Sequence, residues 1–226
     1  MKKLILMAAV AGLLAMAALP AQAHTGPAQY LNVQGYDTGS GQWQRHSADS
    51  PLDTGRARLK LAVAEQTGND YVVARAEHTG IVGKGLARVR NLSFDVLTST
   101  YVGAGSPRIS VEVDTTGDGD ADVYAYLAAF HCTEAIPGSN WARADFTGRI
   151  SAGCDLYASD QAGPYASTGT QSAWAVFAAA HPGATVIDAY VVADEVGQSY
   201  IDNLAFQRHV FTGKGRMAEC TTEASC

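Results

Sequence analysis

Four aspartates gather in residues 114–122, which read Asp-Thr-Thr-Gly-Asp-Gly-Asp-Ala-Asp. Carboxylates this close in the chain repel one another unless water or a cation lies between them, and Ca²⁺ takes hard oxygen ligands of this kind. The two glycines permit the positive-φ backbone that lets ligands converge, although they would also serve a plain hairpin turn. The sequence therefore predicts a calcium site in this loop, with a solvated acidic turn as the alternative.

The spacing Asp-x-Thr-Gly-Asp-Gly-x-x-Asp, followed by an aliphatic and an aromatic residue, resembles the calcium loop of integrin-type FG-GAP repeats and of related Asp-x-Asp-x-Asp-Gly sites. The resemblance implies that Asp114, Asp118 and Asp122 are the acidic ligands. Asp120 falls where the family uses a backbone carbonyl, and Thr116 stands where the family has Asn or Asp. These five residues are the metal set that the resemblance implies for Ca²⁺.

Two tryptophans lie among polar residues and are candidates for binding a sugar. Trp43 lies in the segment Gly-Gln-Trp-Gln, and Trp141 follows Ser-Asn. An exposed aromatic ring can stack on the apolar face of a pyranose. We therefore interpret Trp43 and Trp141 as ligand-binding residues in loops, with the alternative that each closes an end of the fold.

The sequence lacks the common catalytic signatures. It contains no Gly-x-Ser-x-Gly elbow, no His-Glu-x-x-His helix and no phosphate loop. Asp194 and Glu195 follow a predicted strand, where neighbouring side chains point to opposite faces, so we interpret them as a solvated loop rather than a glycosidase pair. Asp202 lies in an apolar strand and is expected to bond to backbone or to pair with an arginine such as Arg108. No catalytic residue is assigned, and whether the protein is an enzyme stays open, with a non-enzyme favoured.

The first 23 residues have the organisation of a secretory signal peptide. Lys2 and Lys3 precede an apolar run from Leu4 to Leu19 and an Ala-Gln-Ala cleavage site. Cleavage would leave His24 as the first residue of a secreted or periplasmic protein, and no second segment approaches the ~20 apolar residues of a membrane span. The α-amine and imidazole of His24 could chelate copper, as in the histidine brace of lytic polysaccharide monooxygenases, or form an ordinary mature terminus.

An exported chain with an even number of cysteines is expected to form disulfides. Three pairings are possible among Cys132, Cys154, Cys220 and Cys226. Proximity in the chain favours Cys132 with Cys154 and Cys220 with Cys226. Zinc is the rival interpretation, although no Cys-x-x-Cys motif occurs.

The charge balance bears on the partners of the protein. The chain has 16 Lys and Arg against 22 Asp and Glu, a net charge of -6. Removing the two lysines of the signal peptide leaves 14 against 22, a net charge of -8. This acidic balance argues against nucleic acid and anionic membrane as partners.

Alternation of apolar and polar residues with a period of two predicts most of the secondary structure. The predicted strands cover residues 57–63, 71–77, 86–96, 108–114, 123–127, 186–192 and 200–206. Apolar residues at i, i+3, i+4 and i+7, starting at Trp174, predict one short α-helix around 170–181, which Pro182-Gly183 ends.

Many strands, one helix and no regular strand-helix alternation indicate a mainly β protein with an antiparallel β-sandwich of jelly-roll type. We expect one domain over residues 24–212, followed by a tail over 213–226 that closes a small disulfide loop. The segment Tyr-Ile-Asp-Asn-Leu at 200–204 resembles the last strand of galactose-binding-like and other carbohydrate-binding sandwich modules. With the Gly-Ser-Pro-Arg segment at 105–108 and the acidic hairpin, it also resembles uncharacterised secreted bacterial sandwich domains.

These expectations converge on an exported, calcium-stabilised β-sandwich that binds carbohydrate or another cell-surface or extracellular partner. One alternative is a carbohydrate-active enzyme of the jelly-roll type, a glycosidase or a lyase. Another is a structural protein of an extracellular matrix. The oligomeric state is left open.

Overall fold

A computed structural model describes residues 31–45, 57–68, 70–77, 79–100, 102–103, 105–131, 133–147, 155–159, 172–212 and 217–219. The predicted signal peptide, His24 and all four cysteines lie outside these residues, so export, copper binding and the disulfides stay predictions. Within the described part of the chain, no helix is long and apolar enough to cross a membrane.

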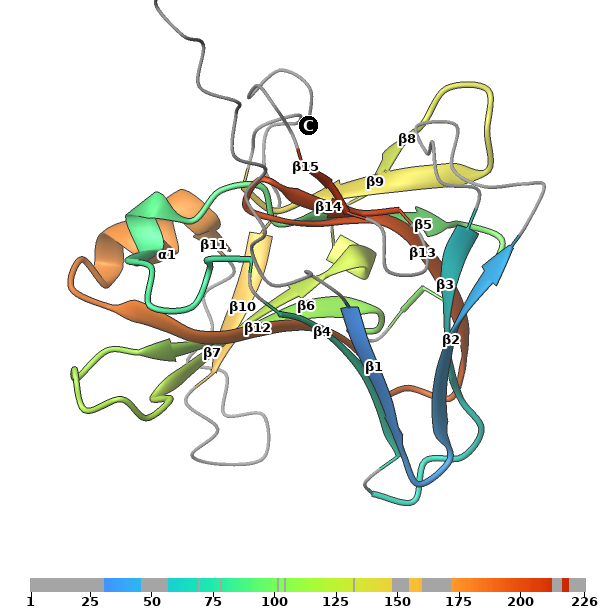
Figure 1. The fold of residues 1–226 in the computed structure, drawn as a ribbon, viewed down its shortest axis with the longest axis horizontal. Coiled ribbons are helices and arrows are strands. Elements are labelled where there is room, and N and C mark those ends of the chain that lie inside the picture. The colour runs from blue at the N-terminus through green and yellow to red at the C-terminus, as the bar shows by residue number, and fades with distance from the viewer. Residues whose placement is uncertain are drawn as a thin grey trace, which may run out of the picture.

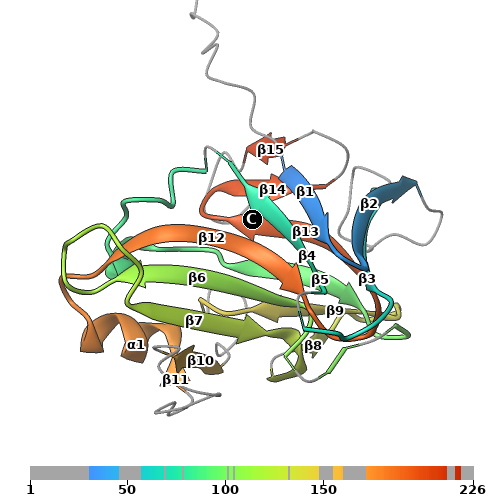
Figure 2. The same ribbon diagram turned by 90° about the horizontal axis from the view of Figure 1, so that it is seen from below.

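Two antiparallel sheets lie against each other (Figures 1 and 2). The first is seven-stranded, and its strands run across the sheet in the order β1 (Leu31–Tyr36), β4 (Tyr71–Ala76), β12 (Thr185–Ala193), β6 (Arg108–Asp114), β7 (Val123–Ala128), β10 (Asp155–Ser159) and β11 (Ser172–Ala173). This arrangement confirms the predicted antiparallel β-sandwich.

The second sheet is eight-stranded. Its main path is β15 (Met217–Glu219), β14 (His209–Phe211), β13 (Gly197–Phe206), β5 (Ser93–Leu97), β9 (Trp141–Asp145) and β8 (Glu134–Ala135). The long strand β13 also pairs with β3 (Ala57–Val63), which in turn pairs with β2 (Gly39–Arg45).

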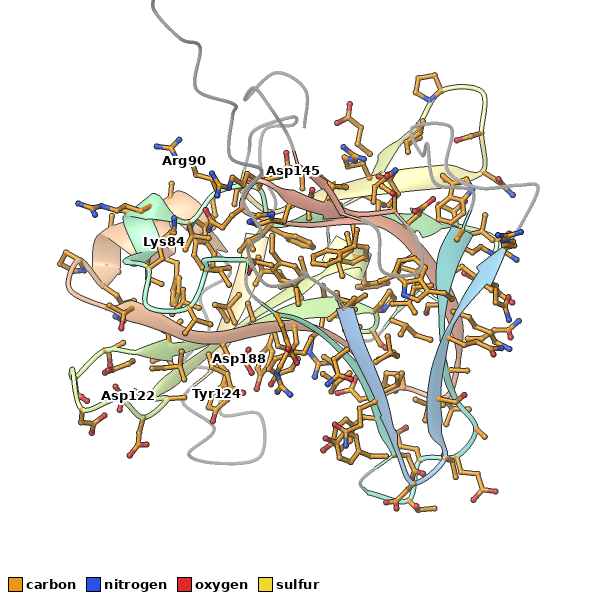
Figure 3. All side chains as sticks on the ribbon, in the orientation of Figure 1. Lys84, Arg90, Asp122, Tyr124, Asp145 and Asp188 are labelled. Atoms are coloured by element: carbon orange, nitrogen blue, oxygen red, sulfur yellow. The ribbon has the colours of Figure 1, made fainter. Side chains whose placement is uncertain are left out.

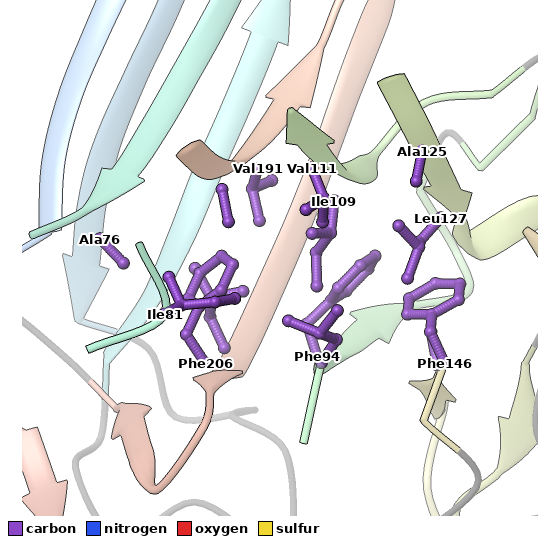
Figure 4. Packing of buried hydrophobic residues seen from close by; sticks show 14 of the residues in the cluster. Ala76, Ile81, Phe94, Ile109, Val111, Ala125, Leu127, Phe146, Val191 and Phe206 are labelled. Atoms are coloured by element: carbon purple, nitrogen blue, oxygen red, sulfur yellow. The ribbon is translucent and has the colours of Figure 1, made fainter. Parts of the chain in front are cut away.

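The core lies between the two sheets, where their inward side chains form one hydrophobic cluster. Figure 4 shows Ile109 and Val111 of the seven-stranded sheet facing Phe94 and Phe206 of the eight-stranded sheet and Phe146, which follows β9 directly. All five are buried. Burying a side chain of this size contributes about 1.5–3 kcal/mol, so this cluster is the main source of stability that fixes the two sheets together.

One short helix, α1 (Trp174–Ala180), covers an end of the sandwich, as predicted. Trp174, Phe177 and Ala178 are its buried residues. The indole Nε1 of Trp174 donates a hydrogen bond to the carbonyl of Leu86 at 3.2 Å, which satisfies the polar atom of a buried ring.

The predicted strand over 86–96 is wrong in its first half. Residues Leu86–Arg88 form a 3-10 helix, η1, and the strand β5 begins only at Ser93. Asn91 has φ 52°, a left-handed conformation that interrupts an extended run. A second 3-10 helix, η2 (Ala129–His131), follows β7.

Candidate metal centre and the adjoining sheet face

The acidic loop joins β6 to β7 at one end of the sandwich. The two strands pair from Arg108 with Ala128 up to Val113 with Val123, so Asp114 and Asp122 leave the ladder side by side. The backbone N–H of Asp122 donates to the carbonyl of Val113 at 2.9 Å and closes the base of the loop. The alternating apolar residues of β6 and β7 therefore fix both ends of the candidate ligand set.

Three carboxylates converge at this loop. One ligand oxygen from each of Asp114, Asp118 and Asp122 can be chosen so that all three lie within 4.8 Å of one another. Asp114 is buried, Asp122 is half-buried and Asp118 is exposed. Donors of this kind, all oxygen and all anionic, fit Ca²⁺ and give a soft metal nothing to bind.

Backbone N–H groups surround Asp114. Its Oδ1 accepts hydrogen bonds from Thr116 N at 3.0 Å and Gly117 N at 2.5 Å, and its Oδ2 accepts one from Gly119 N at 2.9 Å. These bonds, led by that from Gly117, lower the pKa of Asp114 below its usual range. Gly117 and Gly119 have φ values of 85° and 92°, which other residues rarely adopt, so the glycines are what bring these N–H groups to the carboxylate.

Asp122 is held in a similar way. Its Oδ2 accepts from Thr115 N at 2.7 Å, from Thr115 Oγ1 at 3.0 Å and from Thr116 N at 3.0 Å. The bonds from Thr115 are the main reason why the pKa of Asp122 is lowered. The Oδ1 of Asp118 accepts from Asp120 N at 3.0 Å. Among the described hydrogen bonds, one oxygen of Asp118 and one of Asp122 therefore stay available to a cation.

The two remaining residues of the implied metal set add no carboxylate to this cluster. Thr116 is exposed and gives its backbone N–H to both Asp114 and Asp122. Asp120 is exposed, and its carboxylate does not belong to the group of three. The loop therefore contains an aspartate inside the cluster, Asp118, and one outside it, Asp120, only two positions apart.

The two candidate sugar-binding tryptophans were predicted to lie in loops. The structure places both of them on strands. Trp43 lies on β2, opposite Leu59 of β3, and is half-buried against the core. Trp141 lies on β9, is 2% exposed and packs with Leu97 and Ile136. Strand pairing, which polar neighbours in the sequence did not indicate, buries the Trp141 ring and leaves no open face for a sugar.

Of two other aspartates, the predicted environment of Asp194 needs correction, and one of the two alternatives for Asp202 is confirmed. Asp194 does not lie in a purely solvated loop: its Oδ1 and Oδ2 accept from Nη1 and Nη2 of Arg108 at 2.7 and 2.6 Å. Arg108 is therefore taken by Asp194 and does not pair with Asp202. The Oδ1 of Asp202 accepts the backbone N–H of Asn203 at 2.8 Å, which agrees with the expected bond to backbone.

The outer face of the seven-stranded sheet carries a group of aromatic and charged side chains that the sequence did not indicate as a site. The group, which we name the tyrosine face, consists of Arg75, Glu112, Tyr124, Tyr126, Asp188 and Tyr190. Figure 3 shows Tyr124 and Asp188 pointing from this sheet away from the core. The signal for this face in the sequence was the alternation in residues 123–127. It places the two tyrosines of β7 on one side of the strand and the apolar residues on the other.

Strand register brings the tyrosine face together from four strands. In one row, Arg75 of β4 lies opposite Tyr190 of β12, which is followed by Ser110 of β6 and Tyr126 of β7. In the next row, Asp188, Glu112 and Tyr124 are neighbours.

Contacts across these rows hold the polar groups in place. The hydroxyl of Tyr190 donates to Glu112 Oε1 at 2.9 Å, and Arg75 Nε donates to Asp188 Oδ2 at 2.6 Å. The Arg75 guanidinium lies 5.2 Å from the centre of the Tyr190 ring. Burial, aided by the neighbouring charge of Glu112, raises the pKa of Tyr190 well above its usual range, so its hydroxyl stays a donor at neutral pH.

The rings of Tyr124 and Tyr126 have nearly parallel planes, 18° apart, with centroids 6.5 Å from each other. Both tyrosines are half-buried. The guanidinium of Arg108 lies 5.1 Å from the centre of the Tyr126 ring. Partial burial also raises the pKa of Tyr124.

The opposite sheet contains a buried pair of acids. Asp95 of β5 and Asp202 of β13 lie opposite each other, and both are 0% exposed. The carboxylate of Asp95 accepts hydrogen bonds from Arg143 Nε at 2.6 Å and from Asn203 Nδ2 at 2.7 Å. Its ion pair and its burial give Asp95 a structural role.

Comparison with known proteins does not place the chain in a family. No family model, no curated protein and no solved structure matches the chain.

Proposed function

We propose that this protein is an exported β-sandwich binding module that is stabilised by Ca²⁺ in the 114–122 loop and that recognises an extracellular partner, carbohydrate above all. The observation that carries the proposal is the convergence of Asp114, Asp118 and Asp122, whose ligand oxygens lie within 4.8 Å of one another.

The need for a cation follows from the charge of the loop. Three carboxylates around one point repel one another, and backbone N–H groups offset only part of that repulsion because they carry partial charges. A bound divalent cation would offset the rest. Ca²⁺ accepts irregular sets of oxygen ligands, whereas Mg²⁺ demands a near-octahedral set and gives up its water reluctantly, so this all-oxygen ligand set favours Ca²⁺.

The surroundings of the acidic residues outside the 114–122 loop favour a binding role over glycoside hydrolysis. A glycosidase holds two carboxylates on either side of the bond that it cleaves, where substrate can reach both. Among the described residues outside the loop, Asp95 and Asp202 lie opposite each other but are fully buried. Asp188 and Glu112 are also paired across strands, but each already accepts a hydrogen bond from a neighbouring side chain, Asp188 from Arg75 and Glu112 from Tyr190. The charges of the tyrosine face, in contrast, lie beside half-exposed aromatic rings, which suits the binding of a sugar.

Calorimetric titration tests the metal part of the proposal. Mature protein stripped with a chelator is titrated with Ca²⁺ and, separately, with Mg²⁺. We expect saturable binding of Ca²⁺ by the wild type, weaker binding of Mg²⁺, and loss of the Ca²⁺ signal in Asp118→Ala. The matched control, Asp120→Ala, removes an equal charge from the same loop but should keep the signal. A wild type that takes up no Ca²⁺ would reduce the loop to an acidic turn.

A further inference from the structure

The tyrosine face combines the two kinds of group that bind sugars. A pyranose has C–H groups on one face and hydroxyls around its rim, so its receptor needs a flat apolar surface and fixed polar groups beside it. We propose that the tyrosine face binds a neutral polysaccharide chain. The inference deepens the binding function proposed above, on which it rests, by assigning the site and the ligand class.

The aromatic half of the site is provided by β7. Tyr124 and Tyr126 are two positions apart on this strand and therefore share its outer side, with ring planes 18° apart. Their centroids are separated by 6.5 Å. Nearly parallel rings repeated along one strand can meet sugar units repeated along a chain.

The polar half of the site is fixed before any ligand arrives. Asp188 is held by Arg75, and Glu112 by the hydroxyl of Tyr190. Asp188 also accepts the backbone N–H of Ala189 at Oδ1. A carboxylate has about four lone-pair sites, so both acids have further lone pairs with which to receive sugar hydroxyls. Side chains that are already ordered lose little conformational entropy on binding, which favours affinity for a flexible chain.

The charges on this side of the sheet favour a neutral ligand. Arg75 is paired with Asp188, and the adjacent Arg108 is paired with Asp194 through two hydrogen bonds. An anionic polysaccharide would have to compete with these carboxylates for the arginines and would also meet Glu112. A neutral chain meets no such repulsion. Its hydroxyls can accept hydrogen bonds from the arginines and donate them to the carboxylates.

The site continues directly into the acidic loop. Glu112 and Asp114 lie two residues apart on β6, and Asp122 and Tyr124 have the same spacing across the start of β7. Residues with this spacing on a strand point to the same side. The polysaccharide would therefore run over the sheet next to the loop, with Tyr124 as the ring nearest to it.

Affinity electrophoresis tests the inference. Mature wild-type protein is run through native gels that contain hydroxyethylcellulose, galactomannan or mixed-linkage β-glucan, and through a gel with alginate as the anionic comparison. We expect retardation by at least one neutral polymer and none by alginate. Tyr124→Ala should weaken that retardation by about tenfold in apparent affinity, whereas Tyr124→Phe, which keeps the ring, should stay close to the wild type.

Tyr36→Ala is the matched control, because Tyr36 is a half-buried tyrosine on the same sheet that stacks on Tyr71, away from the tyrosine face. It should bind as the wild type does, and circular dichroism establishes that each variant is folded. Absence of retardation by every neutral polymer, retardation by alginate alone, or undiminished binding by folded Tyr124→Ala would each overturn the inference. If Ca²⁺ binds in the calorimeter while these gels fail, the metal proposal stands and only the polysaccharide site falls; the reverse pattern removes the metal alone.

Discussion

Arg143 and Asp95 lie opposite each other on β9 and β5, with Arg143 Nε 2.6 Å from Asp95 Oδ1. The Asp95 side chain is 0% exposed and that of Arg143 is 13% exposed. We expect Arg143→Ala to lower the free energy of unfolding by about 3–5 kcal/mol, because a buried carboxylate then loses its cation. Urea unfolding of the variant measures this change.

A second ion pair gives the comparison. The Arg75 side chain, 42% exposed, pairs with Asp188 at the same 2.6 Å distance. Solvent screens such a pair, so Arg75→Ala should cost no more than about 1 kcal/mol. Equal losses in the two variants would show that burial is not what sets the value of these pairs.

Calcium should raise the melting temperature of the wild type. A cation that binds the folded loop and not the unfolded chain stabilises by RT ln(1 + [L]/Kd), about 2.7 kcal/mol at a hundredfold excess over Kd. Thermal melts in chelator and in millimolar Ca²⁺ measure the shift. Asp118→Ala should lose the response and Asp120→Ala should keep it. In chelator, Asp118→Ala should melt at or slightly above the wild type, since it removes repulsion.

Acid should destabilise the protein through Asp70. Its carboxylate accepts hydrogen bonds from the hydroxyls of Thr38 and Thr67, both at 2.5 Å, and from their backbone N–H groups. These bonds, led by that from the Thr38 hydroxyl, hold the pKa of Asp70 far below its usual range. The stability from this group is complete above the unfolded pKa of about 3.9 and is lost as pH falls below it.

Melting temperatures between pH 7 and pH 2 test this expectation. Asp70→Asn should start with lower stability at pH 7 and lose less of it on acidification than the wild type. Asp114 and Asp122 have pKa values lowered in the same direction, so part of the acid dependence should persist in this variant. Parallel curves for the two proteins would contradict the role given to Asp70.

Trp141 should behave as a core residue. Trp141→Ala removes a ring that is 2% exposed and should cost about 3–5 kcal/mol in urea unfolding. Trp43→Ala should cost less, because Trp43 is only half-buried at the edge of the core. If the Trp141→Ala protein were as stable as the wild type, Trp141 would not be a core residue and would again be a candidate for ligand binding.

The sequence was sufficient where a local pattern decides the structure. Residues 108–114 alternate Val and Ile with polar side chains and form β6 with the predicted bounds. The helix stripe that begins at Trp174 was found for the same reason. Both patterns report burial on one side of an element, which depends on neighbours in the chain.

The sequence was insufficient where distant strands meet. Arg75 and Asp188, 113 positions apart, touch only because β4 and β12 pair in one register. No local pattern encodes that register, so the tyrosine face was not predicted. Trp141 was misplaced for a similar reason: its polar neighbours suggested a loop, but pairing of β9 with β5 makes the segment a strand.

The hydrogen bond from Asp122 N to Val113 O separates the acidic loop from the ladder beneath it. Because the register of β6 and β7 is already set by their own pairs, the residues between 114 and 122 can change in number without turning any side chain of either strand to the other side. Lengthening such a surface connection costs little chain entropy. The loop is thus an exchangeable tip: insertions and deletions between Asp114 and Asp122 can alter its acidic cluster while the sandwich and its outer sheet face keep their register.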